Sequence, residues 1–357
     1  MKSTLIFILV SSGCAMGSIP WFTGEKELEL SGESLSSGDI DILTSSARFS
    51  AVSGDWTVNG DWSHATYREA YVPVLFGTEK TLTEQTFQTR LGVTREWGRE
   101  WSGTLSMSAY DGYSDYRSIW IAEYYRQLFG AFPAYDEPEP AGYSVSAASS
   151  WNYLRGSGTA KASLFYALDE IAPGWSFDAA AGVPAPGEDT LETLGGSLTV
   201  DQAVNGWLKT RWMFNARNTT DRDLRFGVVN SWAATTGPFA FRVTGGYSDE
   251  SPTFDASHVA AIVEWNFMPE WSASIGVRTY RDSGEIQSSG FNALAPPVQS
   301  SEIFGGLAWD RGDLAASVGI GLLESDYDPL SEDNEFFGNL YKDRDWLTVR
   351  LAATWKF

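Results

Sequence analysis

The charged residues most able to act on small solutes occupy alternating positions in largely apolar segments. Lys209 and Arg211 lie two residues apart, and Arg225, Arg242 and Arg278 occupy comparable positions in later segments. In an extended strand, residues two apart point to the same face. Side-chain charges that face one aqueous space attract and select ions. These five residues therefore predict electrostatic selection of a solute. The alternative is that they pair with nearby acids and only stabilise the structure.

Catalysis has little support in this sequence. There are two histidines, His64 and His258, and the serines beside them point to the opposite face of any strand. The sequence contains neither a GxSxG motif nor a glycine-rich phosphate-binding loop. The acidic segment 326–335 lacks the EF-hand spacing with its glycine. We therefore expect no catalytic residue, no cofactor and no metal site.

The elements that carry these charges alternate between apolar and polar residues. In the segment 101–110, Trp101, Leu105 and Met107 share one face, while Ser102 and Ser106 share the other. Such period-2 patterns recur from residue 22 onward and predict half-apolar strands. No later segment is apolar for the length of a membrane-spanning helix, so a membrane-embedded form of this chain would be a barrel.

The connections alternate as well. Short links are expected near 53–55, 98–100, 155–157, 203–205, 235–237, 268–270 and 310–312, and longer ones near 32–39, 67–81, 112–142, 170–188, 217–222, 248–254, 282–299 and 325–344. This rhythm predicts about 16 strands, within a range of about 14–18, in an antiparallel up-and-down transmembrane β-barrel. Short turns would lie at the periplasmic rim and long loops would be extracellular. A soluble sandwich is the alternative, because its strands alternate too.

Aromatic residues favour the membrane over the soluble alternative. Trp97 and Trp101 flank the turn at 98–100, and Trp265 and Trp271 flank the turn at 268–270. If the short turns share one rim, these rings form a belt at the level of the lipid headgroups, where tryptophan is favoured. One arginine, Arg95, falls on the apolar face near such a turn, where its side chain could extend to the headgroups.

The C-terminus resembles the terminal strand signal of bacterial outer-membrane barrels. That signal has a polar residue, a glycine, and aromatic residues at the third-last and last positions. Arg350, Trp355 and Phe357 fill the polar and aromatic places, and Ala352 stands where the family favours glycine. The resemblance implies location in the outer membrane and insertion by the barrel-assembly machinery. It implies no individual porin family.

The polar face of the strands is expected to line a water-filled lumen, because Arg or Lys facing lipid at mid-depth costs about 2–4 kcal/mol. The predicted pore-lining bases are Arg48, Arg90, Lys209, Arg211, Arg225, Arg242, Arg278 and Arg350. The predicted acids of the lumen wall are Asp61, Glu264 and Glu302.

The third long loop, residues 112–142, combines an aromatic part that is compatible with a helix and an acidic proline-rich part containing Asp136, Glu137 and Glu139. The layout resembles sixteen-stranded porins, in many of which the third loop folds into the lumen with its acids facing a basic wall. The hypothesis is that this loop narrows the pore. A loop that only covers the rim is the alternative.

The first 17 residues are predicted to form a secretory signal, followed by a single barrel domain over 18–357. Lys2 precedes the apolar run 4–10, and a small-residue cleavage site follows. The only cysteine, Cys14, lies inside this segment, and a lipid-anchor role for it is the alternative. The net charge of −21 argues against nucleic acid as a partner.

The function expected from these features is passive diffusion of small hydrophilic solutes or ions through an outer-membrane porin-like channel. The expected partners are outer-membrane lipid and lipopolysaccharide, and a homotrimer is possible since a partner-facing wall and a lipid-facing wall are both apolar. A non-conducting structural or adhesion barrel is the second candidate. A substrate-specific transporter of hydrophobic solutes is the third.

Overall fold

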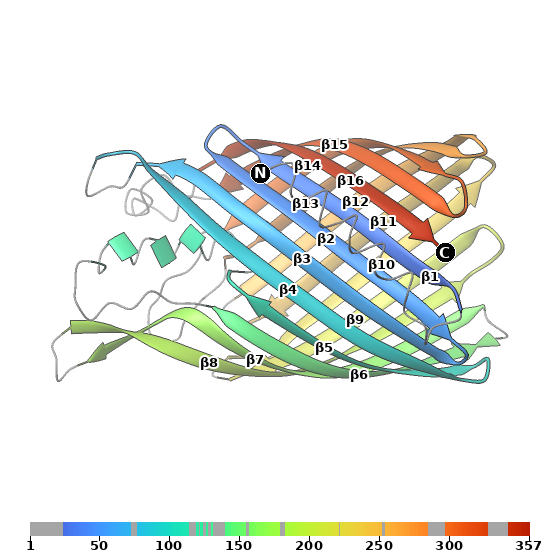
Figure 1. The fold of residues 1–357 in the computed structure, drawn as a ribbon, viewed down its shortest axis with the longest axis horizontal. Helices are drawn as coiled ribbons and strands as arrows, with labels where there is room; N and C mark the ends of the chain where they lie inside the picture. Colours follow the sequence, from blue (N-terminus) through green and yellow to red (C-terminus); the bar gives the residue numbers. More distant parts are fainter. Residues whose placement is uncertain are drawn as a thin grey trace.

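The chain forms one closed barrel of antiparallel strands in the computed structural model (Figure 1). Each strand pairs with its neighbours in the sequence, and β1 pairs with β16 to close the barrel. The strands are β1 (Lys26–Ser36), β2 (Ile40–Ser53), β3 (Trp56–Tyr71), β4 (Lys80–Trp97), β5 (Trp101–Asp111), β6 (Ala141–Tyr153), β7 (Gly158–Asp178), β8 (Val183–Ala203), β9 (Leu208–Thr219), β10 (Arg225–Thr236), β11 (Phe239–Glu250), β12 (Phe254–Met268), β13 (Trp271–Asp282), β14 (Val298–Asp310), β15 (Leu314–Tyr327) and β16 (Arg344–Lys356). The predicted all-β, up-and-down barrel of sixteen strands is confirmed.

The structure describes residues 24–72, 77–113, 119–120, 122–123, 126–127, 130, 140–154, 157–178, 183–220, 222–251, 254–284, 297–327 and 342–357, and only the backbone over 171–178 and 183–189. The expected signal sequence with Cys14 lies outside the described residues, as do Asp136, Glu137 and Glu139. Within the described part, no helix is long and apolar enough to cross a membrane.

The short links form tight turns at one rim. The β4–β5 turn spans 98–100 and the β10–β11 turn spans 237–238, where the expected links lay. Gly98 and Gly237 adopt positive φ angles of 72° and 55°, a conformation that glycine tolerates without steric cost. Strands on either side can therefore reverse within a few residues.

Three of the expected long links are wrong in their bounds. The link expected over 32–39 is only residues 37–39, because β1 continues to Ser36. The link expected over 67–81 is residues 72–79, because β3 continues to Tyr71. The link expected over 170–188 is mostly strand: β7 and β8 pair with each other from Gly158↔Gln202 to Asp178↔Val183. A register shift between Ile171 and Gly174 interrupts the ladder. β6 begins at Ala141, opposite Glu170, so the outer part of this hairpin is two-stranded and extends beyond its neighbours (Figure 1). Prolines, which this hairpin contains, are tolerated in such edge strands.

The start of β1 and the end of β16 meet at the short-turn rim, as the even strand count requires. The backbone N–H of Lys26 donates to the carbonyl of Phe357 at 3.0 Å, and the N–H of Phe357 donates to the carbonyl of Lys26 at 2.9 Å. β1 and β16 stay in register from there to Ser36↔Leu347. Barrel closure therefore satisfies the edges of both terminal strands.

The two faces of the wall differ in chemistry. Leu105, Leu164 and Leu194 point outward and are 69%, 69% and 64% exposed. On the inner face, hydroxyls bond across strands, as between Ser106 and Ser146 at 2.7 Å. A sandwich would bury its apolar face against a second sheet, whereas this barrel presents that face to its surroundings. The outer surface is therefore suited to lipid.

Aromatic rings gather on the outer face beside the short turns. Trp101 and Trp151 stack across β5 and β6 with ring centroids 5.8 Å apart. Phe239 and Trp265 stack across β11 and β12 at 6.3 Å. The rings come from different hairpins and lie at one rim, which is the belt that the sequence predicts.

Candidate functional site

A row of ion pairs crosses the inner face of β1, β2 and β3. The Nε of Arg48 lies 2.6 Å from Asp61 Oδ1, and its Nη1 lies 3.4 Å from Glu29 Oε2. Arg90 of β4 follows in register beside Asp61 and donates to the hydroxyl of Ser106 at 3.3 Å. The structure thus brings the predicted residues Arg48, Asp61 and Arg90 together on one sector of the wall.

Glu302 on β14 is the centre of a second network and is only 3% exposed. Arg278 forms an ion pair with it, Arg350 donates to its Oε1 at 3.0 Å, and Thr348 donates to the same oxygen at 2.8 Å. Arg350 also donates to Glu33 at 2.7 Å, across the junction of β16 and β1. Glu302, Arg278 and Arg350 therefore link β13, β14 and β16, with Glu33 joining β1.

The five bases that suggested a selectivity patch divide into two groups. Arg211 donates to Asp201 at 2.6 and 3.2 Å, Arg225 donates to Glu250 at 2.6 Å, and Arg278 pairs with Glu302. Arg225 is buried, with its guanidinium 4.1 Å from the ring centroid of Phe254. Pairing with acids therefore accounts for these three arginines.

Lys209 and Arg242 form the second group. Both are exposed on the inner face, and both are in register with Ala233, which lies between them on β10. Neither has an acid partner in the described part of the chain. Only the short side chain of Ala233 separates them, so both charges stay exposed on the inner wall near the short-turn rim.

Glu264 on β12 faces two adjoining recesses of the inner wall. One has a volume of about 490 Å³ and extends towards Arg350 and Phe304. The other, of about 540 Å³, extends towards Glu270 and Asp310 at the rim. Between the charged residues, the lining side chains are small, since Ser272 is in register with Ala308, Ala308 with Ser317, and Ser317 with Ala352. Small side chains therefore leave these recesses open between the charged residues of the wall.

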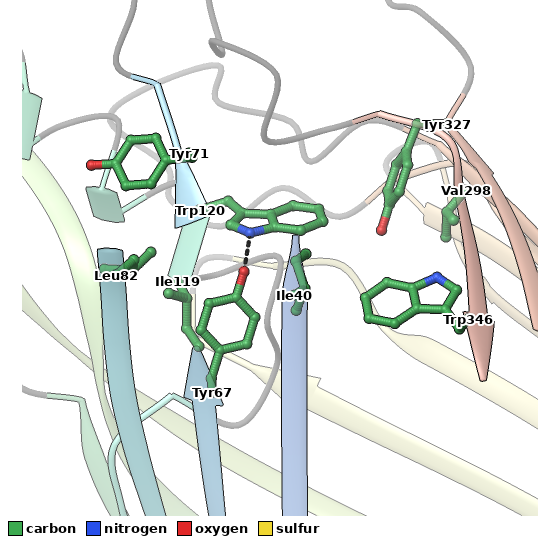
Figure 2. Packing of buried hydrophobic residues seen from close by; sticks show 9 residues of the cluster. All are labelled: Ile40, Tyr67, Tyr71, Leu82, Ile119, Trp120, Val298, Tyr327 and Trp346. Atoms are coloured by element: carbon green, nitrogen blue, oxygen red, sulfur yellow. Dashed lines mark hydrogen bonds between the residues drawn. The ribbon is translucent and has the colours of Figure 1, made fainter. Parts of the chain in front are cut away.

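The third loop contributes two residues that are buried against the inner wall near its long-loop rim. Ile119 and Trp120 lie in a short helical segment, and Trp120 has no exposed surface. The indole Nε1 of Trp120 is 2.5 Å from the hydroxyl of Tyr67 (Figure 2). The same nitrogen is 2.6 Å from Glu69 Oε2. Tyr67 and Glu69 belong to the inner face of β3, so this part of the loop lies inside the barrel wall.

A second carboxylate in the loop extends this contact. Glu123 is 3% exposed and accepts a hydrogen bond from the hydroxyl of Tyr71, the last residue of β3. Arg126 donates to Glu123 at 2.6 Å and Gln127 donates to it at 3.2 Å. One face of the helical segment is therefore fastened to β3 at successive positions.

Apolar and aromatic residues from both sides of the barrel junction enclose Trp120. Its ring packs edge-on against Tyr327 of β15 with centroids 5.7 Å apart. Figure 2 shows Trp120 between the rings of β3 and those of β15 and β16. The enclosing buried residues are Ile40, Tyr67, Tyr71, Leu82, Val298, Tyr327 and Trp346. The loop thus reaches from β5 to strands on the far side of β1.

Charged groups surround the indole. Arg344 of β16 lies with its guanidinium 4.8 Å from the Trp120 ring centroid and donates to Glu69 at 2.9 Å and to Asp39 at 3.1 and 3.2 Å. Lys342 also pairs with Asp39 at 2.7 Å. Burial raises the pKa of Asp39, but the hydrogen bonds and charge of these two bases outweigh it and lower that pKa to about 2. Asp39 therefore stays ionised at neutral pH.

Sequence reasoning missed this cluster. None of Trp120, Glu69, Asp39 and Arg344 was singled out, although the loop as a whole was. One signal was present: Tyr67, Glu69 and Tyr71 share the inward parity at the long-loop end of β3. Three large side chains on the inner face, at the end of a strand, indicate that a loop packs on them.

The terminal strand places its signal residues as the pattern requires. Trp355 and Phe357 lie on the outer face and are 39% and 51% exposed. Arg350 lies on the inner face, in the network with Glu33. Their contribution to assembly stays a prediction.

The two histidines lie on opposite faces of the wall. His64 stacks on the outer face with Phe87, with centroids 4.5 Å apart. His258 lies on the inner face opposite Gly246. In the described ranges, no three His, Cys, Asp or Glu residues cluster in a way that could hold a metal ion.

No known family model matches this sequence, and no curated protein matches it. Solved structures do match. A bacterial polysaccharide outer-membrane secretin has a TM-score of 0.50 at 10% identity, covering 93% of this chain and 98% of that one. CdiB from Acinetobacter baumannii has a TM-score of 0.56 at 9% identity, covering 93% of this chain and 60% of that one. OprB of Pseudomonas putida has a TM-score of 0.50 at 9% identity, covering 94% and 93%. The fold is that of bacterial outer-membrane β-barrel proteins.

Proposed function

We propose that this protein is an outer-membrane channel through which small hydrophilic solutes diffuse passively. The observation that carries the proposal is the contrast between an apolar outer face with an aromatic rim and an inner face of hydroxyls and charges. A barrel of about sixteen strands is wide enough to leave an aqueous channel after its side chains are placed. Charges such as Lys209 and Arg242 then face water at little cost.

The third loop sets the narrowest level in this proposal. Trp120 and Glu123 fix the helical segment to β3, and Arg344 holds it from β16. A segment fastened at that rim obstructs part of the opening. The proposed constriction therefore lies near the long-loop end of the barrel.

In this proposal, two basic residues of the inner wall set the ion preference of the channel. Lys209 and Arg242 lie near the opposite, short-turn end, where no described acid neutralises them. Rings or patches of one charge lower the barrier for the opposite charge. Small anions are therefore the solutes favoured at that level.

The same proposal includes the partners of the barrel. They are lipid and lipopolysaccharide around the wall, the barrel-assembly machinery that inserts the protein, and two further copies of the chain in a homotrimer.

A non-conducting structural barrel is the second candidate, favoured by the complete burial of Trp120 in a cluster at the long-loop rim. A loop packed that tightly could close the lumen. In this candidate the ion pairs of the wall serve only stability.

Reconstitution of the purified barrel into a planar bilayer separates the two. Stepwise, ohmic conductance with a salt-dependent ion preference supports the channel. Silence of the wild type together with steps after removal of residues 118–140 would show a barrel closed by its loop. Silence of both would reject the channel and leave the structural role.

A further inference from the structure

Arg95 is a positively charged residue on the outer, apolar face of β4, close to the short turn at 98–100. Its backbone partners are Trp56 on β3 and Gly103 on β5. The guanidinium carbon lies 5.1 Å from the ring centroid of Trp56 and 6.0 Å from that of Trp97. Both distances are within the range of cation–π attraction. The side chain is therefore held between two indoles at the level of the aromatic belt.

The geometry of this cradle depends on Gly103. A Cβ atom at position 103 would lie 2.6 Å from Cη2 of Trp97, so the indole occupies the space that glycine leaves. Trp56 and Trp97 are still 46% and 54% exposed. The rings fix the guanidinium and leave the site accessible from outside the barrel.

Arg95 has no acidic partner within the described residues. Its neighbour Glu96 points to the opposite face of the strand. Cation–π contacts engage the face of a guanidinium, while its N–H groups donate in the plane and match the oxygens of a phosphate. Donor groups therefore remain for an external anion.

An apolar groove continues from the cradle along the outer wall. It has a volume of about 690 Å³, and its lining includes Val58, Leu91, Val93, Leu105, Met107 and Leu164. Val93 is two residues from Arg95, and Val58 is two residues from Trp56. A cationic clamp at the rim thus adjoins a surface suited to an acyl chain.

We propose that Trp56, Arg95 and Trp97 bind the phosphodiester of a phospholipid headgroup in the leaflet that surrounds the short-turn rim, with an acyl chain in the adjoining groove. The inference rests on the membrane location in the proposed function but not on conduction. It supplies a counter-charge for Arg95, which otherwise faces the interface unneutralised. It also orients one lipid at a fixed sector of the barrel, over β3 to β8.

The test is native mass spectrometry of the folded barrel, released from detergent with phosphatidylglycerol present. Arg95→Gln should weaken retention of this lipid about tenfold, as expected for loss of a charge-assisted contact worth ~1.4 kcal/mol. Arg99→Gln, in the adjacent turn, removes the same charge outside the cradle and should leave retention unchanged. Replacing Trp56 and Trp97 by leucine should weaken retention although Arg95 remains.

Equal retention by the Arg95→Gln and Arg99→Gln variants would overturn the proposal. Displacement of the lipid by inorganic phosphate would also contradict it, since a free anion would then be the occupant. Heat-dependent gel migration checks that each variant is folded. Failure of the wild type to enter lipid bilayers would instead reject the membrane location, a result distinct from any difference between the variants.

Discussion

Trp120 of the third loop donates its indole N–H to Glu69 of β3 with 2.6 Å between Nε1 and Oε2. Neither side chain has exposed surface. The carboxylate also accepts from Arg344 of β16, so one buried charge connects the loop, β3 and the terminal strand. A buried carboxylate is tolerable only with such partners, because an unpaired one costs several kcal/mol. The loop and the closing strand therefore depend on the same group.

Trp120→Ala should release the helical segment from the wall. Removing a fully buried tryptophan costs about 3–5 kcal/mol, here drawn from the docking of the loop since the strands keep their backbone pairing. Protease cleavage within 114–139 should become faster and single-channel conductance should rise. Trp232→Ala, on the outer face of β10, is the control and should change neither. Unchanged conductance with faster cleavage would place the loop outside the solute path.

Acid should weaken the ion pairs of Asp39 with Arg344 and Lys342, which lie beside Trp120, over a defined pH range. Asp39 has a folded-state pKa of about 2, below its ordinary value of 3.8, so its stabilising contribution is complete above about pH 4 and is lost as the pH falls towards 2. A depression of this size corresponds to about 2 kcal/mol. Hydrogen exchange of the helical segment should increase over that range. Asp39→Asn should already show faster exchange at neutral pH and a smaller acid response; identical acid responses in both proteins would show that Asp39 is not the group involved.

Reversing the charges of Lys209 and Arg242, which have no acid partner among the described residues, should change the ion preference of the channel. The double variant Lys209→Glu and Arg242→Glu replaces two inward cations near the short-turn rim by anions, so the reversal potential in a KCl gradient should shift towards cation preference. Arg99→Glu, in the β4–β5 turn, is the matched control for a charge reversed at the same rim but away from the inner wall. A shift of equal size in the control would assign the effect to the rim as a whole.

The Glu302 network should contribute strongly to barrel stability. Glu302→Ala leaves Arg278 and Arg350 without their shared carboxylate. Because both guanidinium groups are partly exposed and Arg350 keeps Glu33, the loss should be about 1.5–3 kcal/mol. Urea denaturation of the folded barrel in detergent should show a lower midpoint. Glu96→Gln, an exposed acid of the inner face near the short-turn rim, should change stability by less than about 0.5 kcal/mol. Equal midpoints for the two variants would show that the arginines find other partners.

The sequence alone determined the strands and the two faces of the wall, because side chains alternate with a period set by the backbone itself. Leu105 and Ser106 point to opposite faces of the wall, as do Trp97 and Glu96, because each pair is adjacent in one strand. Turn lengths and the aromatic rim then indicate closure into a barrel. The bounds that were wrong, near residues 32–39, 67–81 and 170–188, lie at the long-loop rim, where the length of a strand depends on its partner strand.

Only the tertiary structure decided which charges neutralise each other. Arg225 and Arg242 both face the lumen on adjacent strands, yet Arg225 is buried beside Glu250 while Arg242 is exposed with no acid partner among the described residues. That difference depends on register between strands, which no single segment encodes. Trp120 contacts Glu69 and Arg344, which lie 51 and 224 residues away in the sequence. The partners of this buried indole therefore follow from the closed barrel rather than from any local pattern.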